Sequence, residues 1–228
     1  FLLTLWNTHS FFVTYANIDG FNPWDVQRYW KSQVGGPSLA EVSQNEMDQW
    51  VLSELNSLVL EVTKQLDAYN PTDAARRIED FVELLSNWYV RRSRRRFWKS
   101  ESDWDKEWAY VALYTCLATL CRMIAPFVPF VAEEMYQNLV RAADPSAPES
   151  VHLDSFPEAD TELVDEGLSR SIRLAMRLSS LGRAARSKAS LKVRQPLARV
   201  LVALRSPEER TAVQHVREQI LEELNVKS

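Results

Sequence analysis

Glycine is scarce in this sequence, and its scarcity excludes one common kind of site. Only five glycines occur among 228 residues, so no glycine-rich loop that could cradle phosphates can be assembled. Apolar residues make up 46% of the chain and charged residues 25%, which is enough apolar material for a core. Few glycines, many charges and long runs with helical spacing together predict a mainly α-helical fold.

Cysteine and histidine are also rare. Cys116 and Cys121 stand five positions apart on an expected helix, which is poor geometry for a disulfide, and no second pair could complete a zinc site. His9, His152 and His215 are scattered along the chain. We therefore expect no metal site, and we expect two reduced core cysteines of a cytoplasmic protein.

Long apolar runs are missing as well. None reaches the roughly 18 residues that a membrane-spanning helix needs, and the first residues do not resemble a signal peptide. No nucleophile, base and oxyanion-stabilising group can be combined into a catalytic set, so we expect no catalytic residue. The short apolar runs also lead us to expect no membrane partner. Because no initiator Met is present, we expect an excerpt of a longer chain.

Apolar spacing of three and four residues predicts a series of helices, with Asn70 capping one of them and Pro71 as its first residue. A long polar connection is expected over residues 19–45. The expected helices cover residues 2–17, 47–69, 71–98, 105–124, 130–142, 162–189 and 207–225. Alternation of β-branched residues predicts one strand at 192–204, whose partner strands should lie beyond Ser228 or in another chain.

The net charge of -4 conceals two basic segments. Residues 91–99 carry six basic side chains and no acidic one, and residues 167–207 carry ten without an acid. Local patches, and not the net charge, decide whether a polyanion can dock. In the second segment, RNA-backbone contacts are expected from Lys188, Lys192, Arg194 and Gln195. The alternative is an amphipathic helix whose charged face packs against nothing.

The first basic segment lies at the end of an expected helix. Helical spacing predicts that Arg91, Arg94, Arg95 and Trp98 form one surface stripe, and that Arg92, Arg96 and Lys99 form the adjacent one. Favourable interaction with the helix dipole explains one or two arginines there, but not five within six positions. Repulsion among them favours a polyanionic partner over a merely solvated helix end.

The aromatic residues at this helix end allow two interpretations. Trp98 and Phe97 can stack on an unpaired base, which contributes about 1–3 kcal/mol for each base, or they can pack into the core. Core packing is the preferred interpretation for Phe97, whereas the two are evenly balanced for Trp98. The first stripe is expected to contact an RNA loop. The second is expected to hold phosphates, or to pair with nearby Glu101 and Asp103.

Several stretches resemble class I isoleucyl-tRNA synthetases, in the region that follows the catalytic core. They are LTLWNTHSFFVTYANIDGF (3–21), MDQWVLSELNSL (47–58), LSNWYVRRSRRRFW (85–98), IAPFVPFVAEEMYQNL (124–139) and LKVRQPL (191–197). The resemblance implies an anticodon-binding helical bundle at 1–157 and the beginning of a C-terminal α/β subdomain, with a helix, a strand and a helix, at 158–228. The HIGH and KMSKS catalytic signatures of the family are absent.

The resemblance also implies a partner, the anticodon stem-loop of an isoleucine-accepting tRNA. The parent enzyme would join isoleucine to that tRNA with ATP and magnesium, whereas this fragment would be a monomer, bind no cofactor and be inactive alone. Two alternatives remain open. The chain could be the anticodon-binding module of a sister enzyme such as the valine one, or a helical protein-interaction domain whose arginines meet an acidic partner.

Overall fold

A computed structural model describes residues 1–23, 45–99 and 103–228 of the chain. The expected polar connection at 19–45 therefore lies mostly outside the described residues, as does Glu101. The chain divides into two compact units, Phe1–Val164 and Asp165–Ser228. This division follows Val164, where the sequence suggested a boundary after residue 157. Each unit is considered by itself below.

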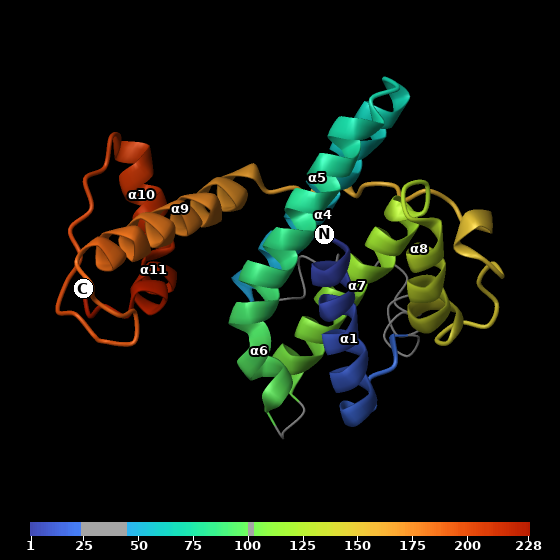
Figure 1. Ribbon diagram of the computed structural model, residues 1–228, viewed down its shortest axis with the longest axis horizontal. Helices are drawn as coiled ribbons and strands as arrows, with labels where there is room; N and C mark the ends of the chain where they lie inside the picture. Colours follow the sequence, from blue (N-terminus) through green and yellow to red (C-terminus); the bar gives the residue numbers. More distant parts are fainter. Residues whose placement is uncertain (24–44, 100–102) are drawn as a thin grey trace. The chain divides into compact units, whose positions relative to one another are not determined.

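The first unit is built from helices. They are α1 (Leu2–Asp19), α4 (Glu46–Asp67), α5 (Pro71–Leu84), α6 (Arg91–Trp98), α7 (Trp104–Ile124) and α8 (Pro129–Tyr136), shown in Figure 1. The wide π-helical turns of Leu85–Val90 join α5 to α6, and those of Gln137–Arg141 extend α8. Short 3₁₀ turns follow at Val151–Leu153 and Thr161–Leu163. The expected mainly α-helical fold is confirmed.

Local sequence explains where two of these helices begin and end. Asn70 caps α5 by accepting a hydrogen bond from the Asp73 backbone N–H at 3.4 Å, and Pro71 opens the helix as expected. Gly20 ends α1 in the left-handed conformation, with φ of 67° and its N–H bonded to the Ala16 carbonyl. Such ends satisfy backbone groups that the helix itself leaves unpaired.

The core of the first unit lies where α4 packs against α5 and α7, and where α1 packs against α7. Its largest fully buried side chains include Trp50, Tyr89, Phe97 and Tyr110. Burying a large apolar side chain contributes about 1.5–3 kcal/mol. The two cysteines are free and buried in α7, as expected, and burial raises the pKa of the Cys121 thiol to about 12. No helix in the described ranges could cross a membrane.

The second unit contains α9 (Glu166–Lys188), α10 (Pro207–His215) and α11 (Arg217–Leu224). The expected continuous helix at 207–225 is thus interrupted at Val216. The expectation of a strand at 192–204 was wrong, because among the residues that the structure describes this segment makes a single parallel bridge, between Leu197 and Val226. Side-chain hydrogen bonds to backbone carbonyls hold residues 192–195 in a turn instead, which explains the error.

Candidate nucleic-acid interface

The arginine-rich helix α6 continues the rod formed by α5 and its π-helical turns. Leu85, Tyr89, Ser93 and Phe97 are all buried, at successive spacings of four residues. In a regular α-helix the twelve steps from Leu85 to Phe97 would make about 3.3 turns, and the buried stripe would drift around the rod. The wider π turns absorb this drift, so α6 keeps one face toward the core and the opposite face toward solvent.

The predicted first stripe is confirmed as an exposed surface. Arg91, Arg94, Arg95 and Trp98 are all exposed. Arg94 and Arg95 make no hydrogen bond or ion pair within the described ranges, so their guanidinium groups remain available to a ligand. Arg91 is more constrained, because its Nε donates to the Asn87 carbonyl at 2.8 Å.

Two arginines of α6 contact the buried indole of Trp88. The guanidinium carbons of Arg91 and Arg92 lie 5.6 and 5.5 Å from its ring centroid. Cation–π attraction at such distances contributes about 0.5–1 kcal/mol where the site is exposed. Burial lowers the pKa of Arg91, and Arg92 is half-buried. Arg92 is therefore less exposed than its predicted place on the second surface stripe implied.

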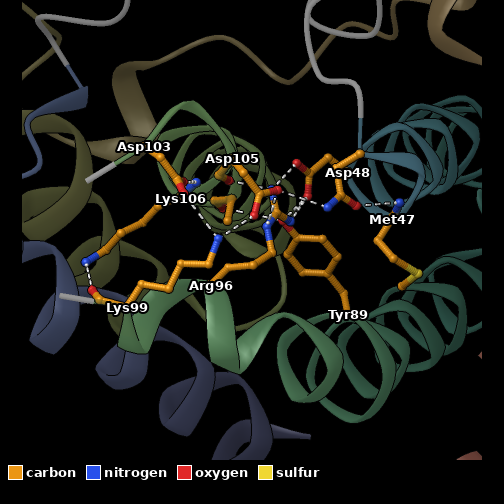
Figure 2. Close-up of polar contacts among 10 residues, drawn as sticks. Met47, Asp48, Tyr89, Arg96, Lys99, Asp103, Asp105 and Lys106 are labelled. Atoms are coloured by element: carbon orange, nitrogen blue, oxygen red, sulfur yellow. Dashed lines mark hydrogen bonds and ion pairs between the residues drawn. The ribbon is translucent and has the colours of Figure 1, made fainter. Parts of the chain in front are cut away.

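Arg96 belongs to the interior and not to the predicted phosphate-binding stripe. Its Nη1 and Nη2 lie 2.6 and 2.7 Å from the two carboxylate oxygens of Asp48, a side chain with 0% exposure (Figure 2). Its Nη2 also donates to the Asp105 carbonyl at 2.6 Å, and its Nε lies 2.9 Å from Asp105 Oδ1. The sequence suggested Glu101 or Asp103 as partners, whereas Asp48 and Asp105 occupy this guanidinium.

Tyr89 completes this buried cluster. Its hydroxyl donates to Asp48 Oδ1 at 2.7 Å, and Figure 2 shows the ring beside the Arg96 guanidinium. Burial and the negative charge of Asp48 raise the pKa of Tyr89 well above its usual value, so the phenol stays protonated. A fully buried carboxylate is stable only when it is paired and hydrogen-bonded, and both conditions are met here.

Lys99 is exposed but already paired. Its Nζ lies 3.2 Å from Asp103 Oδ2 and 3.2 Å from Asp105 Oδ2, and its hydrogen bonds to these carboxylates raise its pKa. The Lys106 ammonium donates to the Lys99 carbonyl at 2.7 Å and lies 2.7 Å from Asp19 Oδ2. These contacts fix the end of α6 against the start of α7 (Figure 2).

The aromatic residues at the end of α6 point in different directions. Phe97 is buried with its ring centroid 5.3 Å from Phe11 and 4.9 Å from Tyr110, which confirms the preferred core interpretation. Trp98 is 56% exposed. Trp104, which sequence reasoning missed, is 70% exposed at the first position of α7. Its acidic neighbours on both sides could have signalled a solvent-facing ring.

The second basic segment also contains both exposed and buried basic residues. Lys188, Lys192, Arg194 and Gln195 are all exposed, in agreement with their proposed surface role. Arg186, in the same segment, is only 5% exposed and points into the second unit. In the sequence Arg186 is only one of the ten basic residues of this segment, and its burial depends on carbonyl groups that no side-chain pattern reveals.

Metal-binding clusters are absent from the part of the chain that the structure describes. No group of three or more histidine, cysteine, aspartate or glutamate side chains there could hold a metal ion. The described carboxylates around α6 are engaged by arginine and lysine.

Comparison with known proteins agrees with this geometry. Over its full length the chain is 64% identical to an isoleucine–tRNA ligase of Dehalococcoides mccartyi (strain ATCC BAA-2266 / KCTC 15142 / 195). Similar enzymes of Clostridium novyi and Thermus thermophilus are 47% and 46% identical, again over the full chain. The chain spans only about a fifth of these relatives, 21%, 20% and 21% of their respective lengths.

A protein family matches the larger part of the chain. The match covers residues 48–202, and the family is described as the anticodon-binding domain of tRNA ligase. The matched range begins at Asp48, the buried partner of Arg96, and includes the whole of α6. This chain therefore belongs to the family of anticodon-binding domains of tRNA ligases.

Proposed function

We propose that this chain is the anticodon-recognition part of an isoleucine–tRNA ligase and that it holds the anticodon stem-loop of an isoleucine-accepting tRNA. The family match and the names of the similar enzymes support this proposal. In this view residues 1–157 form the anticodon-binding bundle, and residues 158–228 begin a C-terminal domain. We also propose that the chain acts as a monomer in the cytoplasm.

The exposed stripe of α6 carries the proposal. Proteins usually read RNA sequence in unpaired loops, where bases can stack on aromatic rings or guanidinium planes. Arg94, Arg95 and Trp98 offer such groups on adjacent turns of one helix. An arginine fork can also hydrogen-bond a phosphate or a base edge with two parallel contacts. This surface fits a splayed loop better than it fits a regular duplex.

The surrounding acids do not neutralise the positive charge of this surface. Asp48 and Asp105 are engaged by Arg96, and Asp103 by Lys99. Arg94 and Arg95 make no ion pair with the described residues, and their mutual repulsion disfavours the free state. A polyanion removes that repulsion on binding, which a neutral partner cannot do.

The chemistry of the parent enzyme is assigned to parts outside this chain. ATP with magnesium, isoleucine and the reacting end of the tRNA would bind there. The chain contributes recognition: it would bind tRNA but would not attach isoleucine when tested alone. An assay for aminoacylation by the isolated chain should therefore give no product, while the same preparation should bind tRNA.

Binding of a fluorescent isoleucine tRNA, measured by anisotropy over a range of salt concentrations, tests this function. The Arg94→Ala/Arg95→Ala variant should lower affinity about ten-fold for each arginine and flatten the salt slope by about 0.7–0.9 for each lost phosphate contact. Arg76→Ala is the matched control, since Arg76 is an exposed arginine on α5 that pairs with Asp73 at 3.4 Å. This control should bind nearly as well as the parent chain.

Three outcomes would contradict the proposal or its parts. Unchanged affinity of the double variant would remove α6 from the interface. Equal competition by valine and isoleucine tRNAs would leave RNA binding intact but remove the assignment to isoleucine. Capture of an acidic protein that survives nuclease treatment, without any bound RNA, would favour the protein-interaction domain.

A further inference from the structure

Arg186 is a buried guanidinium that binds the backbone of two separate segments. It lies in the last turn of α9. Its Nη1 donates to the carbonyls of Lys192 and Gln195, both at 3.0 Å. Its Nη2 donates to the carbonyls of Leu224 at 2.7 Å and Asn225 at 3.1 Å. One side chain thus fastens the turn at 192–195 to the end of α11.

Asn225 also binds this turn through its side chain. It has a φ of 49°, the left-handed conformation that often ends a helix, and its Nδ2 donates to the Val193 carbonyl at 3.1 Å. Arg186 and Asn225 together engage the carbonyls of Lys192, Val193 and Gln195. Three of the turn's carbonyl oxygens are therefore engaged, whereas the side chains of residues 192–195 are exposed.

No acid among the described residues pairs with Arg186. Its four hydrogen-bond partners are neutral carbonyl groups, whereas the nearby Glu223 pairs with Arg183. Carbonyl dipoles stabilise a buried cation without cancelling its net charge. The positive charge of Arg186 therefore adds to the potential at the turn instead of reducing it.

Exposed cations lie in the turn and at the end of α9 just before it. Lys188, Lys192 and Arg194 are exposed and make no ion pair with any residue of the described ranges. The sequence from 167 to 207 also contains no Asp or Glu. A turn with fixed carbonyls, outward cations and no acid of its own fits an anionic ligand that has repeated charges.

We propose that Arg186 and Asn225 are positioning residues that hold residues 192–195 as a preformed cationic turn, and that Lys188, Lys192 and Arg194 bind phosphates of the RNA backbone. This inference rests on the proposed function and adds a second contact to it. Phosphate contacts fix the register and orientation of a nucleic acid, whereas base contacts read its sequence. Holding the turn in advance lowers the ordering cost of binding.

Replacing the outward cations tests the surface itself. In the 228-residue chain, Lys192→Ala/Arg194→Ala should flatten the salt slope of tRNA binding by about 1.4–1.8, because two phosphate contacts are lost. The loss should be similar for isoleucine and valine tRNAs, since backbone contacts carry no sequence information. Arg170→Ala/Arg217→Ala is the matched control, because these arginines already pair with Glu166 and Glu218. It should leave the slope nearly unchanged.

Replacing Asn225 tests the positioning role without removing a charge. Asn225→Gly keeps a residue suited to the left-handed conformation but loses the hydrogen bond to Val193. It should lower tRNA affinity about five-fold, with little change in thermal unfolding. Arg186→Lys keeps the charge but cannot engage four carbonyls, so it should lower affinity and increase proteolytic cleavage within residues 189–206.

The outcomes separate this inference from the function on which it rests. Normal binding by the Lys192/Arg194 double variant, together with weak binding by the Arg94/Arg95 double variant, would overturn the cationic turn and leave anticodon recognition intact. Weak binding by both double variants supports both proposals. If the Lys192/Arg194 variant weakens binding but Asn225→Gly and Arg186→Lys do not, the surface stands and the positioning role is overturned.

Discussion

Asp48 and Arg96 face each other through two parallel contacts of 2.6 and 2.7 Å, although they stand 48 positions apart in the sequence. The pair joins the first turn of α4 to the end of α6 inside the bundle. Bidentate arginine–carboxylate pairs fix geometry as well as charge. The cationic helix is thus anchored by one of its own arginines, which frees its neighbours for the surface.

Breaking this pair should destabilise the first unit strongly. Arg96→Met leaves Asp48 buried without its countercharge, so the free energy of unfolding should fall by about 3–5 kcal/mol in urea titrations. The Arg96→Met/Asp48→Leu double variant should lose less than the single variant, because no unpaired charge remains. Arg76→Ala, which breaks an exposed pair, should cost about 0–1 kcal/mol. Equal losses for the single and double variants would contradict the pairing.

The two adjacent aromatic residues of α6 should respond in opposite ways. Phe97→Ala removes a ring that is 1% exposed and should lower the free energy of unfolding by about 3–5 kcal/mol. Trp98→Ala should change stability by about 0.5 kcal/mol or less but weaken tRNA binding about five-fold or more. Denaturant unfolding and anisotropy on the same preparations measure both effects. A stability loss at Trp98 as large as that at Phe97 would refute the surface assignment.

Acidification should lower the free energy of unfolding through the buried ring of His9. The ring is 4% exposed, and neither nitrogen has a hydrogen-bond partner among the described residues. Burial lowers its pKa, although Glu134 opposes this shift. Because the unfolded chain then takes up the proton more readily, stability should fall as pH drops below about 6.5, and it should level off below the folded pKa.

Chemical unfolding of the parent chain and His9→Leu at several pH values between 5 and 8 checks this linkage. The parent should lose stability toward pH 5 more steeply than the variant, which has no titrating ring at position 9. Parallel pH profiles would show that His9 makes no contribution of this kind.

The turn between α4 and α5 contains a strained backbone conformation that a substitution can relieve. Tyr69 adopts a left-handed conformation with φ of 55° and is 94% exposed, so its ring gains little from packing. Tyr69→Gly should raise the free energy of unfolding by about 0.5–1 kcal/mol, because glycine adopts this conformation without a steric penalty. Tyr69→Ala keeps the strained backbone and should give no gain. Thermal melting of the two variants measures the difference.

Much of the first unit could be predicted from local sequence. Apolar spacing placed its helices, Asn70 and Pro71 marked the start of α5, and helical periodicity identified the exposed face that bears Arg94 and Arg95. These features depend on residues close together in the chain. Sequence motifs, and not periodicity, carried the family resemblance, which the matched family confirms.

The errors concern contacts that a side chain makes outside its own helix. Asp48 looked like an ordinary acid in a first helical turn, and nothing nearby indicated that Arg96 would bind it. The β-branched residues after Lys192 suggested a strand, whereas Arg186 takes up the carbonyls that such a strand would need. A side chain that binds backbone groups of another segment leaves no periodic signal in the sequence.

The π-helical turns of Leu85–Val90 give the rod a spare residue. Deleting one position between Leu85 and Tyr89 would leave eleven steps from Leu85 to Phe97, which is close to three ordinary turns. The core-facing and solvent-facing sides of α6 would then keep their places. The same deletion within α6 would swing every later side chain by about 100°. A one-residue deletion should therefore be tolerated just before the arginines but not among them.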